Sequence, residues 1–357
     1  MTSPSEPSVP PNAKLTLPPD VLNKLLDDAG ATSNRDVLAD IIRTAYQLAG
    51  DGADRLNLKI TRDALKEMRA AFRMFAPYEG VRKVTIFGSA RTHPSDPLYN
   101  QAESLAGRLA EAGWMVVSGA GPGIMEAAVR GAGAARSFGV TIRLPVEEGV
   151  TGLLAGDDKI VSMKYFFTRK LMLMKESSGF VSLPGGFGTQ DETFELLTLF
   201  QTGKAIPSPL VLLDIDGGNY WRRWQQFVVD MLVSGGLISP EDLDIFLITD
   251  DVDQAVAAIR GFWRNYHSIR WVGGRLVIRL QAEPTDTELG ELNERFLDLC
   301  LDGKIESTPP LPVEVSDGDQ LELARLVLRY DRRQVSRLYE LIAALNELAS
   351  APALELL

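Results

Sequence analysis

Short apolar segments alternate with amphipathic helical segments from Arg82 to Tyr266, and this alternation constrains the fold more than any other feature of the chain. The first cycle is the apolar run Lys83–Gly88 followed by a helical pattern over Leu98–Gly113. Later apolar runs include Met115–Ser118 and Phe180–Leu183, each followed by another helical pattern. Strands this short and apolar, separated by helices, are typical of a parallel sheet that is covered on both faces. We therefore predict an α/β fold for this region.

The segments on either side of this region have different patterns. Residues 1–19 hold six of the 20 prolines, which predicts a flexible tail. Residues 20–79 carry two helical patterns, Asp20–Ala49 and Thr61–Ala76, and predict a helical N-terminal segment. The alternation ends before residue 267, so we expect one α/β domain over residues 80–266.

Residues 267–357 are expected to form a small α+β appendage. Gly273 and Gly274 lie between two apolar runs, which is typical of a β-hairpin. A helix is expected over Thr285–Leu301, and the proline-rich segment 306–314 is expected to be extended. The last helix of the α/β domain is expected to run over Val252–Tyr266, directly before this appendage.

Composition excludes several kinds of function. The 37 Lys and Arg residues against 48 Asp and Glu residues give a net charge of −11, which disfavours a nucleic-acid partner. A single cysteine, Cys300, excludes an internal disulfide framework, and two histidines make a multi-histidine metal centre improbable. We therefore expect no metal and no cofactor, and we expect carboxylates to carry any acid–base chemistry. The chain shows neither a signal-peptide pattern nor a long apolar run, so we expect a cytoplasmic protein without a membrane partner.

Two glycine-rich segments follow predicted strands and precede predicted helices. The first is Ser118–Glu126 (SGAGPGIME) and the second is Leu183–Glu192 (LPGGFGTQDE). Glycines allow the backbone to approach a phosphate closely, and the free N–H groups of a helix's first turn attract an anion. Either segment alone could instead be a tight turn that binds no ligand.

Two common phosphate-binding motifs do not fit these loops. A dinucleotide fingerprint requires an acidic residue about twenty residues on, at the end of the next strand, and the predicted strand Gly139–Leu144 has none. A P-loop requires Gly-Lys-Ser/Thr, which follows neither loop. A mononucleotide or sugar-phosphate site built from both loops remains.

Charged residues near the loops suggest the chemistry of the site. Glu192 lies in the first turn of its predicted helix, where it could serve only to balance the helix dipole. A carboxylate beside a phosphate loop could instead stabilise a developing cation, such as the oxocarbenium ion of N-glycosidic bond cleavage. Arg169 and Lys170 begin another predicted helix, where a basic pair favours an anionic partner, either a phosphate or a neighbouring acid.

Residues 184–192 (PGGFGTQDE) resemble the PGGxGTxxE signature of the LOG ("Lonely guy") family. The loop 119–127, the Gly88-Ser89-Ala90 turn and the Arg169-Lys170 pair also resemble motifs of that family, in the same order. The resemblance covers about residues 80–265. It implies a Rossmann-like fold with helices on both faces of the parallel sheet, and a homodimer or higher homo-oligomer. Members of this family are often labelled lysine decarboxylases, but nothing marks Lys170 as a Schiff-base lysine.

The resemblance also implies an activity and a set of site residues. The activity is hydrolysis of the N-glycosidic bond of a nucleoside 5′-monophosphate, either AMP or an N6-modified, cytokinin-type analogue, to free base and ribose 5-phosphate. The implied catalytic pair is Arg169 and Glu192. The implied substrate-binding residues are Gly88, Ser89, Gly119, Gly121, Gly123, Met125, Glu147, Lys170, Gly185, Gly186, Gly188, Thr189 and Thr198.

Two departures from the short plant members bear on the substrate. The first loop reads Gly-Ala-Gly-Pro-Gly instead of three consecutive glycines, and Phe167 replaces the histidine two positions before Arg169. Both departures favour a purine nucleotide over a cytokinin precursor. The alternative from another functional class is a nucleotide sensor or carrier that uses the same loops without catalysis. A DNA-processing protein with a related core is disfavoured by the net charge.

Overall fold

The computed structural model describes residues 16–143 and 152–354. The chain divides into two compact units, Met1–Lys66 and Glu67–Leu357. Each unit is described separately below.

In the described part of the first unit, the helices α1 (Pro19–Asp28) and α2 (Arg35–Gly50) precede the start of α3 (Arg55–Phe75). Leu22, Leu26 and Ala39 form its small apolar core. The single helical pattern expected over residues 20–49 is wrong, because two residues between α1 and α2 adopt left-handed backbone conformations. They are Gly30, with φ +67°, and Asn34, with φ 51°, and glycine and asparagine accept this conformation most readily.

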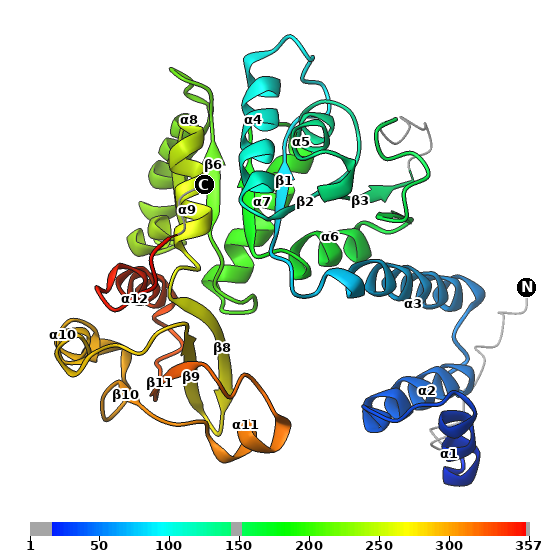
Figure 1. The fold of residues 1–357 in the computed structure, drawn as a ribbon. Helices are drawn as coiled ribbons and strands as arrows, with labels where there is room; N and C mark the ends of the chain where they lie inside the picture. Colours follow the sequence, from blue (N-terminus) through cyan, green and yellow to red (C-terminus); the bar gives the residue numbers. More distant parts are fainter. Residues whose placement is uncertain (1–15, 144–151, 355–357) are drawn as a thin grey trace, which may run out of the picture. The chain divides into compact units, whose positions relative to one another are not determined.

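The second unit contains a seven-stranded, entirely parallel sheet (Figure 1). Its strands are β1 (Lys83–Phe87), β2 (Met115–Ser118), β3 (Ser137–Ile142), β4 (Ile160–Met163), β5 (Gly179–Ser182), β6 (Leu210–Leu213) and β7 (Phe246–Thr249). The strand order is β4-β3-β2-β1-β5-β6-β7. The α/β fold expected from the alternation is confirmed.

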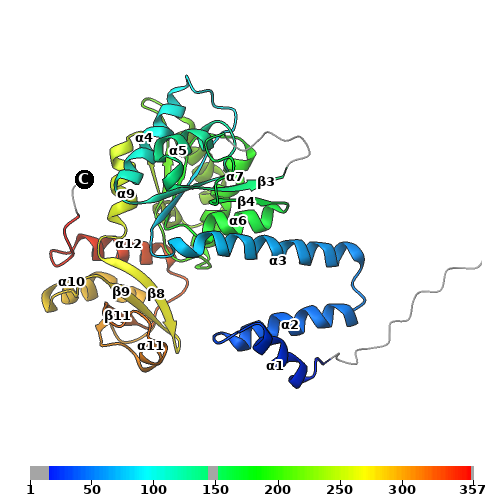
Figure 2. The same cartoon turned by 45° about the vertical axis from the view of Figure 1, so that its right-hand side comes forward.

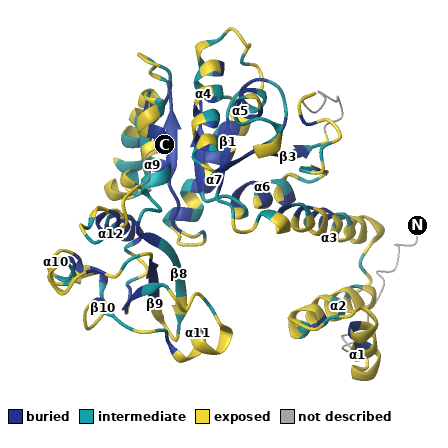
Figure 3. Ribbon diagram, viewed as in Figure 1, coloured by how far each residue is buried: buried dark blue, intermediate teal, exposed yellow. Residues whose placement is uncertain are grey.

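Helices cover both faces of this sheet and complete a three-layer structure. The helices between and after the strands are α4 (Pro97–Glu111), α5 (Ile124–Ala132), α6 (Phe166–Lys175), α7 (Phe187–Gln201), α8 (Tyr220–Phe227) and α9 (Val252–Gly261). On one face, buried side chains of α4, α5 and α9 pack against the strands, and on the other face those of α6, α7, α8 and the end of α3 do so. Figure 2 shows α4 and α5 on one side of β3 and β4 and α6 on the other. Between the two layers the inner strands β1, β2, β5 and β6 are buried along their whole length, whereas the edge strands β4 and β7 are partly exposed (Figure 3).

The strand order places a ligand-binding position at the middle of the sheet. The chain builds outward from β1 to β4 in one direction and then returns to place β5 on the other side of β1. The loops after β1 and β5 therefore diverge to opposite faces of the sheet and leave a crevice at its carboxyl edge. Both the Gly88-Ser89 turn and the second glycine loop lie at this position.

The C-terminal part of the second unit is a four-stranded antiparallel sheet with the order β10-β11-β9-β8. Its elements are β8 (Tyr266–Val272), β9 (Arg275–Leu280), α10 (Asp286–Phe296), β10 (Glu306–Ser307), α11 (Pro312–Asp317), β11 (Ala324–Leu328) and α12 (Val335–Glu347). The expected hairpin at Gly273-Gly274 is confirmed. The sheet belongs to the same compact unit as the parallel sheet, although it has a hydrophobic cluster of its own. The domain boundaries at 79/80 and 266/267 stay predictions.

Two local expectations in this part are wrong. The segment 306–314 is not extended throughout, because Pro312 begins the short helix α11, and proline at the first helical position loses no helical hydrogen bond. The helix expected over Val252–Tyr266 ends at Gly261, and Tyr266 begins β8. No helix in the two described ranges is long and apolar enough to cross a membrane.

Candidate functional site

An open cavity of about 890 Å³ lies at the carboxyl ends of β1 and β5. This volume is within the range of small-molecule sites. Its lining residues come from the turn after β1, the two glycine loops, and the first turns of α6 and α7. Among the predicted site residues, the cavity is lined by Gly88, Ser89, Gly119, Met125, Arg169, Gly185, Gly186, Gly188, Thr189 and Glu192.

The glycines of the second loop differ in what surrounds them. A Cβ atom added to Gly185 would collide with the side chain of Thr189, so packing alone requires glycine there. A Cβ atom added to Gly186 or Gly188 would meet no protein atom within 4 Å. Both of these glycines are exposed in the cavity at the N-terminus of α7. Packing therefore explains Gly185, whereas the open space beside Gly186 and Gly188 is available to a ligand.

The first glycine loop packs closely against its neighbours. A Cβ atom on Gly119 would collide with the Arg169 guanidinium, and a Cβ atom on Gly123 would collide with the backbone oxygen of Ser89. Gly123 also has a positive φ of 69°, which favours glycine. Gly121 lies against the methyl end of Met125. Neither Gly121 nor Gly123 lines the cavity, so the structure assigns them to the turn that supports it.

Arg169 and Glu192 face each other across the cavity wall. Arg169 Nη1 lies 3.6 Å from Glu192 Oε1, close enough for an ion pair. A hydrogen bond fixes the Arg169 side chain, because its Nε donates to the backbone oxygen of Val140 at 3.0 Å. Glu192 is 5% exposed, and its second oxygen, Oε2, has no hydrogen-bond partner. A buried carboxylate oxygen without a partner is costly unless a ligand, a water molecule or a proton satisfies it.

The electrostatic surroundings of Glu192 favour its protonated form. Burial is the largest influence and raises the pKa of Glu192 to about 7, although the positive charges of Arg169 and Lys170 lower it. Nearby Glu195 and Asp191 raise the pKa further, by repulsion between like charges. Burial also lowers the pKa of Arg169, against the attraction of Glu192. A carboxyl group with a pKa near neutrality can both hold and release a proton under physiological conditions.

Lys170 is not among the residues that line this cavity. Its ammonium lies 2.8 Å from Asp191, which lines the cavity, and 2.5 Å from Glu195, which does not. Burial acts to lower the pKa of Lys170, but the hydrogen bonds to these two carboxylates raise it overall. Of the two explanations offered by the sequence, an ion pair with neighbouring acids is the one that the structure shows for Lys170.

Tyr220 is a cavity residue that the sequence analysis missed. Its hydroxyl donates to the backbone oxygen of Gly185 at 2.6 Å and lies 2.6 Å from Gln190 Nε2, which donates to it. Asp214 holds the start of α8, because its carboxylate accepts from the backbone N–H of Tyr220 at 2.8 Å. The tyrosine therefore supports the second glycine loop from a helix that follows it in the sequence. No motif marks this contact, which the packing of α8 against the loop creates.

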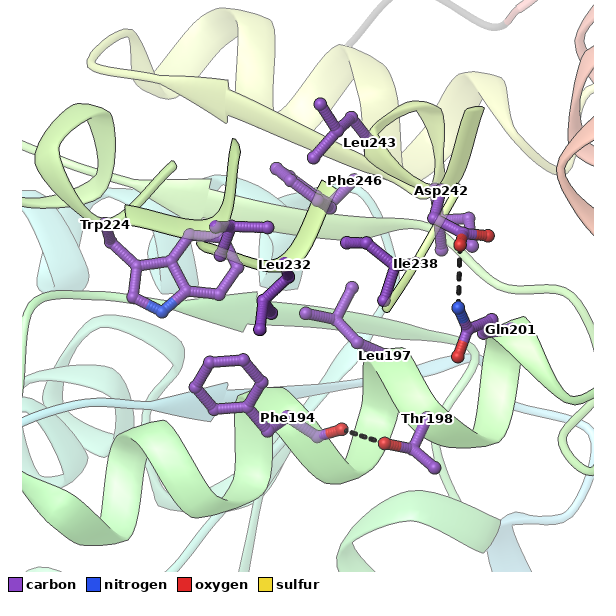
Figure 4. A pocket seen from close by; sticks show the side chains of 12 residues that line it. Phe194, Leu197, Thr198, Gln201, Trp224, Leu232, Ile238, Asp242, Leu243 and Phe246 are labelled. Atoms are coloured by element: carbon purple, nitrogen blue, oxygen red, sulfur yellow. Dashed lines mark hydrogen bonds between the residues drawn. The ribbon is translucent and has the colours of Figure 1, made fainter. Parts of the chain in front are cut away.

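Thr198 is not among the residues that line the cavity with Arg169 and Glu192. It lines a separate apolar cavity of about 180 Å³ behind α7, together with Trp224 and the side chains of the segments after α8 (Figure 4). Its hydroxyl donates to the backbone oxygen of Phe194 at 2.8 Å, so it is satisfied within its own helix. Thr198 is six positions after Glu192 on α7, which places it away from the helix's first turn. Glu147 lies outside the described residues.

Comparisons with known proteins agree with the motifs. Residues 123–259 match the model of a family described as possible lysine decarboxylase. A cytokinin riboside 5′-monophosphate phosphoribohydrolase of Arabidopsis thaliana is 26% identical over 185 residues, which cover 51% of this chain and 78% of that protein. A homologous enzyme of Oryza sativa subsp. japonica is 28% identical over 190 residues, 52% of this chain and 75% of that protein.

Solved structures also show similarity, at a lower level. The molybdenum cofactor carrier protein of Chlamydomonas reinhardtii is 21% identical, covers 50% of this chain and 96% of its own, and has a TM-score of 0.37. An identity and a TM-score this low do not indicate which ligand this chain binds. The motifs, their order along the chain, the family match and the curated relatives together support an assignment of the parallel-sheet region to the LOG family.

Proposed function

We propose that this protein hydrolyses the N-glycosidic bond of a nucleoside 5′-monophosphate, AMP or a related N6-modified nucleotide, to free base and ribose 5-phosphate. The observation that carries the proposal is the Arg169–Glu192 pair, 3.6 Å apart, in a cavity that is also lined by the second glycine loop. The names of the curated relatives, which are phosphoribohydrolases, support the same reaction class.

The 5′-phosphate would bind at the N-terminus of α7. Gly186 and Gly188 leave open space there, and the first turn of a helix offers backbone N–H groups to an anion. Thr189 adds a hydroxyl at the same position. The ribose would then lie next to Glu192, which is only three positions after Thr189 on the same helix.

Glu192 would stabilise the positive charge that develops on the ribose. The bond between the base and the ribosyl carbon breaks with its electron pair leaving on the base, and the ribose becomes an oxocarbenium ion. Ionised Glu192 stabilises this cation and takes a proton from the attacking water, whose oxygen bonds to the ribosyl carbon. The departing base takes up a proton from solvent. Arg169 holds the carboxylate in place and offsets negative charge on the nucleotide.

Four proteins test this proposal: the wild type, Glu192→Gln, Arg169→Ala and Glu195→Gln. Each is incubated with AMP and other nucleoside monophosphates, and free base is measured by chromatography. Glu195 is the matched control, because it lies on the same helix but pairs with Lys170 outside the cavity. We expect loss of activity of about 10²-fold or more in the first two variants, as for other groups that act on transition-state charge. We expect Glu195→Gln to retain activity.

Two results would contradict the proposal. Full activity in Glu192→Gln or Arg169→Ala would remove the catalytic assignment. Nucleotide binding without base release from any monophosphate would favour the sensor or carrier instead.

The proposal includes a homodimer or higher homo-oligomer in the cytoplasm, where nucleoside monophosphates are metabolised. Phe166, Phe167 and Leu171 of α6 are 55%, 56% and 45% exposed. Phe166 also lines the cavity, so the apolar surface continues from the site onto α6. A contiguous apolar surface of this kind is typical of an interface, and closed homo-oligomers most often use the same surface of both subunits.

A further inference from the structure

Glu67 is a buried carboxylate on a face of α3 that is otherwise apolar. It is 6% exposed, and it precedes Ala71 and Phe75, which are 0% and 2% exposed, by four and eight positions. Residues at this spacing share one face of a helix. Ala71 and Phe75 belong to the core that also contains buried residues of α6 and α7. A charged side chain in such a position is retained at a cost unless it is well hydrogen-bonded.

Both oxygens of Glu67 are used by the start of α6. The backbone N–H of Lys164 donates to Oε1 at 2.8 Å, and the hydroxyl of Thr168 donates to Oε2 at 2.6 Å. Thr168 is fully buried, and Tyr165, which precedes the helix, makes no side-chain cap of its own. Glu67 thus supplies, from another helix, the negative charge that favours a helix N-terminus.

The residue that follows Thr168 is Arg169. Arg169 lies in the first turn of α6, and its side chain lines the cavity. Its guanidinium lies against Gly119 and 3.6 Å from Glu192. The position of the first turn therefore sets the distance between the two charged groups. A displacement of about 1 Å at a reacting group can lower a rate by about 10²-fold.

We infer that Glu67 is a positioning residue, which fixes the first turn of α6 and through it the placement of Arg169 opposite Glu192. Glu67 is not among the residues that line the cavity, so it acts without touching substrate. This gives the C-terminal half of α3, which precedes the parallel sheet, a role in the site. The inference rests on the proposed function for its effect on catalysis, and on hydrogen bonds alone for its effect on α6.

Two substitutions of Glu67 separate hydrogen bonding from side-chain bulk. Glu67→Ala removes both acceptors. Glu67→Gln keeps one oxygen for the Lys164 N–H, and its amide can donate to the Thr168 hydroxyl, so it should preserve most of the geometry. We expect Glu67→Ala to lower kcat by about 10-fold or more with a smaller change in KM, and Glu67→Gln to recover most of that loss.

The pH dependence gives a readout that general destabilisation would not change. The charged groups that face Glu192 are Arg169, Lys170, Asp191 and Glu195. Because the charge of Arg169 lowers the pKa of Glu192, moving Arg169 away should raise that pKa. The acid side of the kcat/KM profile should therefore move to higher pH in Glu67→Ala and stay near the wild-type position in Glu67→Gln.

Glu288→Gln is the matched control. The Glu288 carboxylate accepts from two backbone N–H groups, those of Thr285 and Ser350, at 2.8 and 3.0 Å, but it does so at the start of α10. Losing its charge should destabilise the fold while leaving the pH profile unchanged.

Hydrogen exchange of residues 164–169, measured in full-length protein, tests the inference without activity. We expect faster exchange in Glu67→Ala than in wild type, and wild-type exchange in Glu288→Gln. Unchanged exchange and an unchanged acid limb in folded Glu67→Ala would overturn the inference. If Glu67→Ala does not fold, Thr168→Val removes one of the same hydrogen bonds, and wild-type exchange and pH profile in that variant would overturn it equally. Absence of base release from the wild type would contradict the proposed function and leave the exchange result to decide the inference.

Discussion

Replacing Glu192 by glutamine should abolish activity and, above neutral pH, stabilise the fold. The carboxyl group is 5% exposed, and one of its oxygens has no hydrogen-bond partner. Burial raises its pKa from 4.5 to about 7, even with Arg169 nearby. The folded protein therefore holds this proton more tightly than the unfolded chain does. A site arranged for catalysis often carries such a cost in stability.

The size and the sign of the change in unfolding free energy follow from the difference between the pKa of Glu192 in the folded and the unfolded chain. A change in pKa from 4.5 to about 7 corresponds to about 3 kcal/mol. Between these two values the unfolded chain has released the proton while the folded protein keeps it, so the free energy of unfolding falls as the pH rises. The cost is absent below pH 4.5 and fully present above about pH 7. Glutamine does not titrate, so the unfolding free energy of Glu192→Gln does not include this loss.

Urea unfolding of wild type and Glu192→Gln, at several values between about pH 5 and about pH 8, measures the effect. We expect the difference in unfolding free energy to grow by about 2–3 kcal/mol in favour of Glu192→Gln across this range. Glu288→Gln is the control, because hydrogen bonds from the Ser350 and Thr285 backbones lower the pKa of Glu288 to about 2. That variant should be less stable than wild type by an amount that hardly changes over the same range. A constant difference for Glu192→Gln would refute the raised pKa.

Three further predictions address the site and its surroundings. Gly188→Ala should fold at least as stably as wild type, because its Cβ atom meets no protein atom within 4 Å, but it should raise the KM for a nucleotide. Gly185→Ala should instead lower the Tm, because its Cβ atom collides with the Thr189 side chain. A wild-type KM in Gly188→Ala would argue against phosphate binding there. Leu171→Glu should reduce the molar mass measured by light scattering, because it places a charge on the exposed face of α6; an unchanged mass would exclude this face as the interface. Wild-type kcat/KM should fall on the acid side of about pH 7, because the ionised form of Glu192 is needed; a flat profile down to about pH 5 would contradict that role.

Local patterns in the sequence were sufficient to predict the parallel sheet and its helices. The inner strands β1, β2, β5 and β6 are short, mostly apolar runs that are buried along their whole length, and a signal of this kind needs no knowledge of distant contacts. Prediction failed where a backbone conformation at one residue decides the outcome. The turn at Gly30 interrupts an otherwise continuous helical pattern, and Pro312 begins a helix in a segment that resembles an extended strand.

Sequence motifs indicate some residues of the candidate site, but they do not indicate residues whose roles depend on contacts between distant parts of the chain. Motifs in the sequence mark Arg169 and Glu192 as candidates, but only the fold places them 3.6 Å apart. Tyr220 and Glu67 were missed because their roles depend on contacts with residues 35 and about 100 positions away, which leave no periodic signal. Thr198 was included by position in the family pattern, whereas the geometry of α7 places it beside a different cavity.

The most direct test of the proposed function is incubation of purified protein with AMP, followed by measurement of adenine and ribose 5-phosphate. The wild type should release both products in equal amounts, and Glu192→Gln should release neither while still binding the nucleotide. If the wild type binds AMP and other nucleoside monophosphates without releasing any base, the protein is not a phosphoribohydrolase, and the Arg169–Glu192 pair serves binding alone.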